Sequence, residues 1–289
     1  MKKIRIVSPA KQIEAQHLSF TVDFLTSKGF EVELGKHAAG QYHYFSGTDE
    51  ERLFDFQQAL DDESVDAILC SRGGYGSVRI LDQLDFSAFL QKPKLIFGYS
   101  DITVFHHHVQ AKYNLSSVHS TAPLNFSSNS KEALESLLNV LNGQPNQYEF
   151  QAHNLNRSGQ TKAKVMGGNL AILYSLIGTD SDFDYHGKIL FIEEIGEAVY
   201  AVDRMMWSLK KAGKLENLAA LIVGGMTSMK DSQIPFGKTV EEVIAESVEE
   251  YSYPLCFNFP AGHIDDNRAI IFGKEAELRV SEISQFRQG

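Results

Sequence analysis

Residues 1–140 alternate between short apolar runs and longer segments whose apolar residues recur every three or four positions. Such runs predict strands buried on both faces, and the longer segments predict helices. The expected strands are Ile4–Ser8, Phe30–Leu34, Val65–Ser71 and Leu95–Phe97. The expected helices are Glu14–Lys28, Thr48–Leu60, Ser77–Leu84 and Thr103–Tyr113. This alternation predicts an α/β fold with a parallel sheet covered by helices.

The second half of the chain is less regular, and the pattern does not assign Ser117–His119. Strands are expected at Lys162–Val165, Gly187–Glu193, Leu218–Val223 and Leu255–Phe259, and helices at Asn169–Ile177, Val202–Ala212 and Val240–Glu249. Asn142–Gln147 is polar, rich in helix breakers and without apolar periodicity, which is typical of a linker. We therefore predict an N-terminal domain at 1–142, a linker at 143–160 and a C-terminal domain at 161–289.

Composition narrows the partners and the compartment. The net charge of −10 argues against nucleic acid and anionic membranes, because both favour a basic surface. Two cysteines, Cys70 and Cys256, fit a reducing compartment better than a disulfide framework. The apolar run after Met1 is too short for a signal peptide, and no span of about 20 apolar residues follows. A cytoplasmic protein is expected.

The first candidate for chemistry is the corner Gly98-Tyr99-Ser100-Asp101, where a strand turns directly into a helix. Such a corner can hold a serine clear of the sheet as a nucleophile, and the N–H of Asp101 is then a candidate oxyanion donor. The alternative is that Ser100 only caps the helix, a role that serine fills well.

The glycine-rich turn Arg72-Gly73-Gly74-Tyr75-Gly76 follows the neighbouring strand and lies on the same rim of the predicted sheet. It lacks the Lys-Ser/Thr of a phosphate-binding loop. Its glycines let the backbone approach a ligand closely, so the N–H of Gly73 or Gly74 is a candidate second oxyanion donor. An ordinary tight turn is the alternative.

Two acidic residues and one histidine follow expected strands of the second half. Glu193 and Glu194 are adjacent, so they point to opposite faces and at most one faces a given site. His263 follows Pro260-Ala261-Gly262. A serine, a carboxylate and a histidine can form a Ser–Glu–His triad, although such groupings also arise by chance.

Other candidates have equally plausible structural roles. His106-His107-His108 lie about 100° apart on a helix and do not converge on one ion, so we expect them on the helix surface and expect no metal. Asn169 and Arg204 are candidates for binding substrate, as are Arg72 and Tyr75 in the glycine-rich turn. A helix cap and a surface ion pair are the alternatives for Asn169 and Arg204.

The chain resembles the LD-carboxypeptidase family of serine peptidases, whose relatives include microcin immunity peptidases. The resemblance covers nearly the whole chain and is specific in the order of its motifs. These are Ile6–Ala10, Phe45–Leu53, Arg72–Gly76, Gly98–Asp101, Gly167–Leu170, Leu190–Glu197 and Gly262-His263.

The resemblance implies that Ser100 is the nucleophile, Glu193 the triad carboxylate and His263 the triad histidine. It implies an N-terminal α/β domain that bears the serine and a C-terminal α/β domain, with a mixed or barrel-like sheet, that bears the other two. It also implies a cytoplasmic homodimer that needs no metal or cofactor. The implied activity is removal of terminal D-alanine from murein tetrapeptides during wall recycling.

Two departures from the family pattern bear on the substrate. Met166 stands where some members have tryptophan, and Ile264-Asp265-Asp266-Asn267 after His263 does not map to a substrate preference. The chain is shorter than the microcin immunity branch, which favours the murein substrate. A microcin-immunity-like peptidase acting on aminoacyl-nucleotide conjugates stays an alternative, as does a non-catalytic binder of an anionic ligand.

Overall fold

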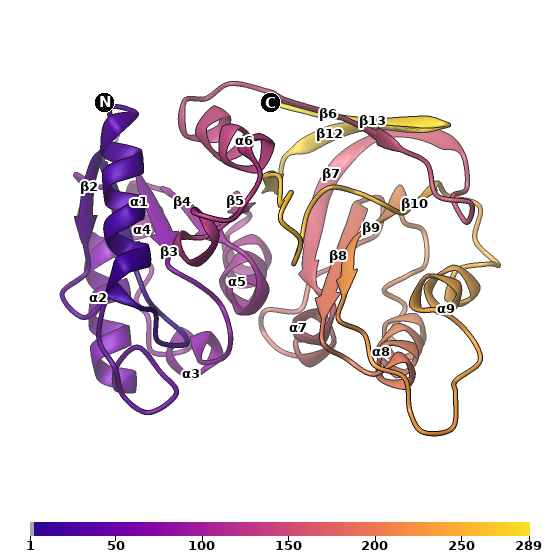
Figure 1. Ribbon diagram of the computed structural model, residues 1–289, viewed down its shortest axis with the longest axis horizontal. Coiled ribbons are helices and arrows are strands. Elements are labelled where there is room, and N and C mark those ends of the chain that lie inside the picture. The colour runs from indigo at the N-terminus through magenta and orange to yellow at the C-terminus, as the bar shows by residue number, and fades with distance from the viewer. Residues whose placement is uncertain (1–2) are drawn as a thin grey trace.

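The computed structural model describes residues 3–289 and contains two sheets side by side (Figure 1). The first sheet has the strand order β11-β5-β4-β3-β1-β2. Its strands are β1 (Lys3–Val7), β2 (Glu31–Leu34), β3 (Ala67–Cys70), β4 (Leu95–Gly98), β5 (Ser117–His119) and β11 (Ile270–Phe272). β1 to β5 pair in parallel, and β11 is antiparallel to β5. The predicted parallel sheet is confirmed, and the unassigned segment Ser117–His119 is its fifth strand.

Helices cover this sheet on its two faces. They are α1 (Ala15–Ser27), α2 (Asp49–Asp61), α3 (Ser77–Leu81), α4 (Ser87–Gln91), α5 (Thr103–Tyr113) and α6 (Lys131–Leu141), with the short 3₁₀ turns η1 (Ser100–Ile102) and η2 (Pro123–Asn125). The start of α2 has a capping box, in which Thr48 accepts from the Glu51 N–H and Glu51 accepts from the Thr48 N–H. This cap defines where α2 begins.

The second sheet has the strand order β10-β9-β8-β7-β12-β13-β6. Its strands are β6 (Asn146–Gln151), β7 (Gly159–Asn169), β8 (Ile189–Ile195), β9 (Ala220–Thr227), β10 (Leu255–Cys256), β12 (Glu275–Val280) and β13 (Ile283–Gln288), and its helices are α7 (Leu170–Ser175), α8 (Val199–Lys211) and α9 (Val240–Ser247). β7 to β10 pair in parallel, whereas β12, β13 and β6 add antiparallel strands. The sheet is mixed, as expected. It is open, with β10 and β6 at its edges, so it is not a closed barrel.

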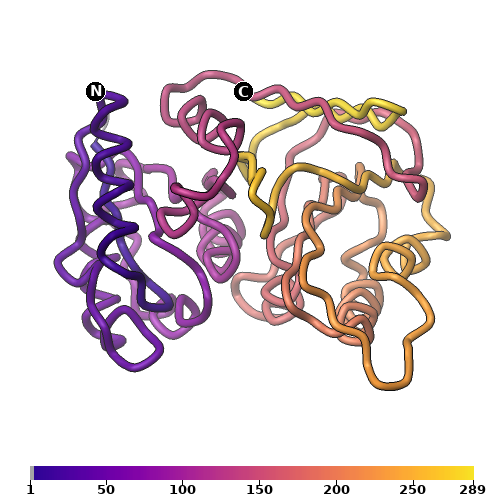
Figure 2. Tube along the Cα trace, in the orientation of Figure 1, coloured from indigo at the N-terminus to yellow at the C-terminus, as the bar shows by residue number. Residues whose placement is uncertain are grey.

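One strand crosses between the halves of the chain. β11 leaves the C-terminal half and pairs with β5 of the first sheet. The tube in Figure 2 lets this crossing be followed by colour, because yellow C-terminal chain reaches the magenta part of the molecule. The segment 143–160, predicted as a linker, contains β6, which pairs with β13 from Asn146 to Gln151. The domain boundaries at 142 and 161 stay a prediction.

The expectation that the histidine tract lies on a helix surface is wrong. His106, His107 and His108 are all buried in α5, which lies between the two sheets and contacts both β5 and β7 (Figure 1). Their ring nitrogens bond the carbonyls of Gly98 and Gly167 and the hydroxyl of Ser181, respectively. Burial lowers the pKa of His106 to about 3 and that of His107 to about 4, so both rings are neutral packing groups. The second half of the chain covers the face of α5 that would otherwise be in water.

Candidate active site

The corner after β4 has a strained backbone. Gly98 has φ +154°, and a side chain there would lie 2.9 Å from that of Ile102. Ser100 has φ +64°, which costs a non-glycine residue about 1–3 kcal/mol. Neither η1 nor α5 has a side-chain cap at its start, so Ser100 does not serve as an N-cap. The turn instead holds the Ser100 hydroxyl at the carboxyl edge of the sheet, as a nucleophile elbow does.

Three side chains from separate elements meet at this corner. His263 Nε2 lies 3.2 Å from Ser100 Oγ, and His263 Nδ1 lies 2.5 Å from Glu193 Oε2. Glu193 comes from β8 and is completely buried, while His263 comes from the loop after β10. The structure thus brings together all three residues that the resemblance groups, in the order hydroxyl, imidazole, carboxylate.

The loop that carries His263 is held by contacts that the sequence did not reveal. Gly262 has φ +105°, and a side chain there would lie 2.7 Å from Glu193 Cβ. Only glycine therefore lets the His263 loop approach β8 this closely. Buried Asn267 accepts the Gly262 N–H through Oδ1 at 2.8 Å, and the same oxygen lies 3.1 Å from His119 Nε2. Asn267 belongs to the acidic run after His263 that could not be interpreted from the pattern alone.

Two opposing effects act on the imidazole. Burial lowers the pKa of His263, but the carboxylate of Glu193, through its charge and its hydrogen bond, raises the pKa to a net value above the usual 6.5. The ring of Tyr99 packs 4.8 Å from the imidazole ring and shields one side of it. The Tyr99 hydroxyl donates to Asn125 Oδ1 at 2.8 Å, which fixes that ring in place.

The glycine-rich turn lies against Ser100. A side chain on Gly73 would lie 2.7 Å from Ser100 Cβ and 3.0 Å from both Ser100 Oγ and the Asp101 nitrogen. A side chain on Gly74 would point elsewhere, to 2.8 Å from Lys11 Cβ. Of the two candidate donors, Gly73 is therefore the one beside the serine. The two strand ends share one rim, as expected.

Buried polar groups fix this turn. Asp101 Oδ2 accepts the Ser77 N–H at 2.9 Å, which ties the corner of Ser100 to the start of α3. Burial raises the pKa of Asp101. The buried side chain of Arg52 donates to the carbonyls of Pro9 and Gly76 and to Asp49. These bonds keep both backbone segments of the site rigid.

Two models of one protein family match the chain. The LD-carboxypeptidase N-terminal domain matches residues 4–120, and the LD-carboxypeptidase C-terminal domain matches residues 162–278. A probable murein peptide carboxypeptidase of Bacillus subtilis is 30% identical over 286 residues, spanning 96% of this chain and 89% of that protein. The chain belongs to the LD-carboxypeptidase family.

Other LD-carboxypeptidase-like proteins match over similar lengths. The crystal structure of muramoyltetrapeptide carboxypeptidase from Oxalobacter formigenes superposes with a TM-score of 0.90 at 26% identity, covering 100% of this chain and 99% of that one. The microcin C7 self-immunity protein of Escherichia coli is 26% identical over 277 residues, covering 84% of this chain and 79% of that protein. Both branches named by the sequence resemblance are thus found among the similar proteins.

The four candidate substrate residues of this family member lie in different surroundings. Arg72 is partly buried beside Gly73, and Tyr75 is half exposed on the same turn. Asn169 is buried as the N-cap of α7, with its amide bonded to Glu194 and to the Ile172 N–H. Arg204 is exposed on α8, over the ring of Tyr200. Asn169 thus has the capping role that was its alternative.

Glu194 faces away from the imidazole and holds the backbone at the start of α7. It accepts the Asn169 amide at 2.9 Å and the N–H groups of Ala171 and Ile195 at 2.7 and 2.8 Å. Burial raises its pKa.

Replacing Glu194 by alanine leaves these three N–H donors without an acceptor. We expect the free energy of unfolding to fall by about 3 kcal/mol, measured by urea titration. Glu194→Gln, which keeps one acceptor oxygen, is expected to lose less stability and to retain turnover per folded molecule. If Glu194→Gln abolished turnover while Glu193→Gln did not, the triad carboxylate would be Glu194, on the opposite face of β8.

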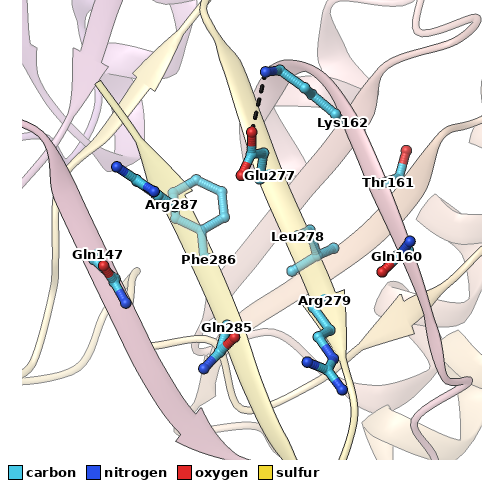
Figure 3. Close-up of a pocket in the computed structure, with 10 residues that line it drawn as sticks. All are labelled: Gln147, Gln160, Thr161, Lys162, Glu277, Leu278, Arg279, Gln285, Phe286 and Arg287. Atoms are coloured by element: carbon cyan, nitrogen blue, oxygen red, sulfur yellow. Dashed lines mark hydrogen bonds and ion pairs between the residues drawn. The ribbon is translucent and has the colours of Figure 1, made fainter.

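A hollow of about 630 Å³ on the outer face of the second sheet is separate from this site (Figure 3). It is lined mostly by outward-facing residues of β6, β7, β12 and β13, including the ion pair between Lys162 and Glu277, with buried Leu278 and Phe286 at its base. None of the candidate site residues lines it. Among residues 3–289, no cluster of three or more potential metal ligands occurs, and no helix is long and apolar enough to cross a membrane.

Proposed function

We propose that this protein is a serine LD-carboxypeptidase that removes terminal D-alanine from murein tetrapeptides, with Ser100, His263 and Glu193 as its triad. The observation that carries the proposal is the contact series from Ser100 Oγ to His263 Nε2, and from His263 Nδ1 to Glu193 Oε2, in a member of this family. The names of its relatives support a murein peptide as substrate. A cytoplasmic homodimer acting in wall recycling is part of the same proposal.

The first half of the reaction forms an acyl-enzyme. Neutral His263 takes the Ser100 proton at Nε2 while Oγ attacks the carbonyl carbon of the diamino acid residue. Glu193 accepts the Nδ1 proton in a hydrogen bond, which keeps Nε2 free to act as the base and stabilises the imidazolium that forms. The carbonyl π electrons move to oxygen, where the N–H groups of Gly73 and Asp101 stabilise the oxyanion.

The second half releases both products. The C–N bond breaks as His263 gives its proton to the departing nitrogen of D-alanine. A water molecule, deprotonated by the same ring, then attacks the ester and returns Ser100 to its starting state.

The deciding measurement compares two substrates on the purified protein. Incubation with a murein tetrapeptide ending in D-alanine is expected to yield free D-alanine and the tripeptide, detected by mass spectrometry. The tetrapeptide ending in L-alanine serves as the control. Turnover of an aminoacyl-nucleotide conjugate, with none of the tetrapeptide, would favour the microcin-immunity activity that the Escherichia coli relative suggests.

A serine-reactive probe separates both enzymatic proposals from a binding protein. A fluorophosphonate is expected to label one residue per chain, Ser100, as read by peptide mass spectrometry. Absence of labelling at high probe concentration would instead support a non-catalytic binder of an anionic ligand.

The position of Gly73 gives a further prediction. Gly73→Ala places a methyl group in the space between the serine oxygen and the Asp101 nitrogen. We expect kcat to fall about 10²- to 10³-fold, the size of effect seen when one oxyanion donor is lost. Because the new Cβ would lie 2.7 Å from Ser100 Cβ, the serine corner must shift, and urea titration on the same preparation separates a loss of rate from a loss of folded protein. Wild-type turnover in Gly73→Ala would exclude Gly73 from the oxyanion site.

A further inference from the structure

Arg72 is a partly buried cation without an anionic partner. Its Nη1 donates to the carbonyl of Gln12 at 3.1 Å, and its Nε is buried without a hydrogen-bond partner. Within residues 3–289, no carboxylate lies within ion-pair distance of its guanidinium. Burial lowers the pKa of Arg72, so the surroundings disfavour its charge as they stand. A partly buried guanidinium with free donors is suited to a planar anion from outside the chain.

A hollow of about 400 Å³ opens beside this guanidinium. It is lined by Lys11, Gln12, Ile13, Glu14, His17, Gln41, Arg72 and Leu124. Lys11, like Arg72, pairs with no carboxylate in the described chain, and its ammonium lies over the ring of Tyr44. The one acid, Glu14, already accepts from Gln16. This hollow therefore combines two unpaired cations in a chain whose net charge is −10.

The hollow adjoins the candidate active site. Arg72 directly precedes Gly73, which lies against Ser100. Leu124, which also lines the hollow, directly precedes Asn125, whose side chain accepts the Tyr99 hydroxyl. Tyr99 packs against the imidazole of His263. Burial raises the pKa of Tyr99, and the charge of Arg72 opposes that rise. The departing nitrogen must lie at His263 Nε2 to receive its proton. In a terminal residue the free carboxylate is only two bonds from that nitrogen.

We propose that Arg72, assisted by Lys11, binds the free α-carboxylate of the substrate's terminal residue and thereby restricts cleavage to the last peptide bond. This inference rests on the proposed carboxypeptidase function. The guanidinium can bind both carboxylate oxygens in parallel, which fixes the direction of the leaving residue as well as its charge. An internal peptide bond has no carboxylate at this distance, so an endopeptidase reaction would leave Arg72 unpaired.

The test uses two substrates that differ only in this charge, the tetrapeptide with a free D-alanine carboxylate and the same peptide with a D-alanine carboxamide. Wild-type protein is expected to have a kcat/KM roughly 100-fold higher for the acid. Arg72→Gln should reduce that ratio at least 10-fold through the acid alone, with the carboxamide changing less than about threefold. Arg72→Lys should restore part of the preference, because it returns the charge without the planar fork. Lys11→Met should reduce the preference less than Arg72→Gln.

Arg279→Gln is the matched control, since it removes an exposed arginine on the outer face of the second sheet, away from this hollow, and should leave both substrates unaffected. Fluorophosphonate labelling of Ser100 reports an intact site in every variant, because that probe has no carboxylate. An unchanged acid-to-amide ratio in labelled Arg72→Gln and Arg72→Lys overturns the inference while the proposed function stands. If wild-type protein cleaves neither peptide, the proposed function fails and this inference fails with it.

Discussion

Ser100→Ala is expected to lower kcat on the tetrapeptide by a factor on the order of 10⁵ to 10⁶. The substitution removes only the hydroxyl group, whose oxygen lies 3.2 Å from His263 Nε2. Alanine at φ +64° has the same backbone strain as serine, so the free energy of unfolding should change by less than about 1 kcal/mol. Single-turnover assays and urea titration on the same preparation check both expectations.

Ser100→Gly also removes the hydroxyl, but it relieves the backbone strain that Ser100→Ala keeps. Glycine adopts positive φ without strain, so this variant should be at least as stable as Ser100→Ala while being equally inactive. A corner that is strained in order to present a nucleophile exchanges stability for activity in this way. Retained turnover in either variant would remove Ser100 from the mechanism, and a strong loss of stability in both would return it to a structural role.

The first sheet could be predicted because its strands and helices have different apolar periods. β3 consists of four consecutive buried residues, and α2 begins with a capping box. Both elements can therefore be predicted from the local sequence. The rim that β3 and β4 share then follows from parallel pairing alone. This is why the glycine-rich turn and Ser100 could be expected in one place before any contact was known.

Of the last two strands, only β12 has a local signature in the sequence. Polar and apolar residues alternate along Glu275–Val280, the pattern of a strand with one face in water. In β13 the structure buries Ser284 and Gln288 and exposes Ile283, so its alternation is not visible in the sequence. The crossing of β11 into the first sheet is different, because no local pattern specifies which sheet a short strand joins. Pairing of β11 with β5 depends on the assembled second half.

The candidate site likewise has parts that the sequence predicts and parts that it does not. Strand alternation predicted that only one of Glu193 and Glu194 faces the histidine, but the choice between them came from family resemblance. The structure supplies the reason, since Glu194 is committed to backbone donors at α7. His119 could not be found from the sequence, because its bond to Asn267 in the His263 loop joins residues 148 positions apart. Long-range polar contacts of this kind leave no periodic trace.

Glu193→Gln is expected to lower kcat by about 10³- to 10⁴-fold with little change in KM. The amide can place its NH₂ group toward His263 Nδ1, which stabilises the tautomer whose Nε2 carries the proton and cannot accept one from Ser100. The fold should persist, because glutamine has nearly the same volume in this buried position. Glu194→Gln is the matched control on the same strand, and it should retain turnover per folded molecule.

The pH profile of Glu193→Gln tests the electrostatic role of the carboxylate separately from its geometry. In the wild-type protein the pKa of His263 lies above 6.5, so kcat/KM should fall as pH drops through a value higher than that of a free histidine. Without the Glu193 carboxylate, burial is the largest effect left and lowers the pKa of His263, opposed only by the smaller effect of the Glu194 charge. The acid limb of the variant should therefore move to lower pH, with the residual rate measured between pH 5 and 9.

A limb that stays in place would mean that Glu193 orients the imidazole without stabilising its charge. A limb that moves to higher pH would contradict the assignment of this pair, because removing an adjacent anion cannot make a cation easier to form.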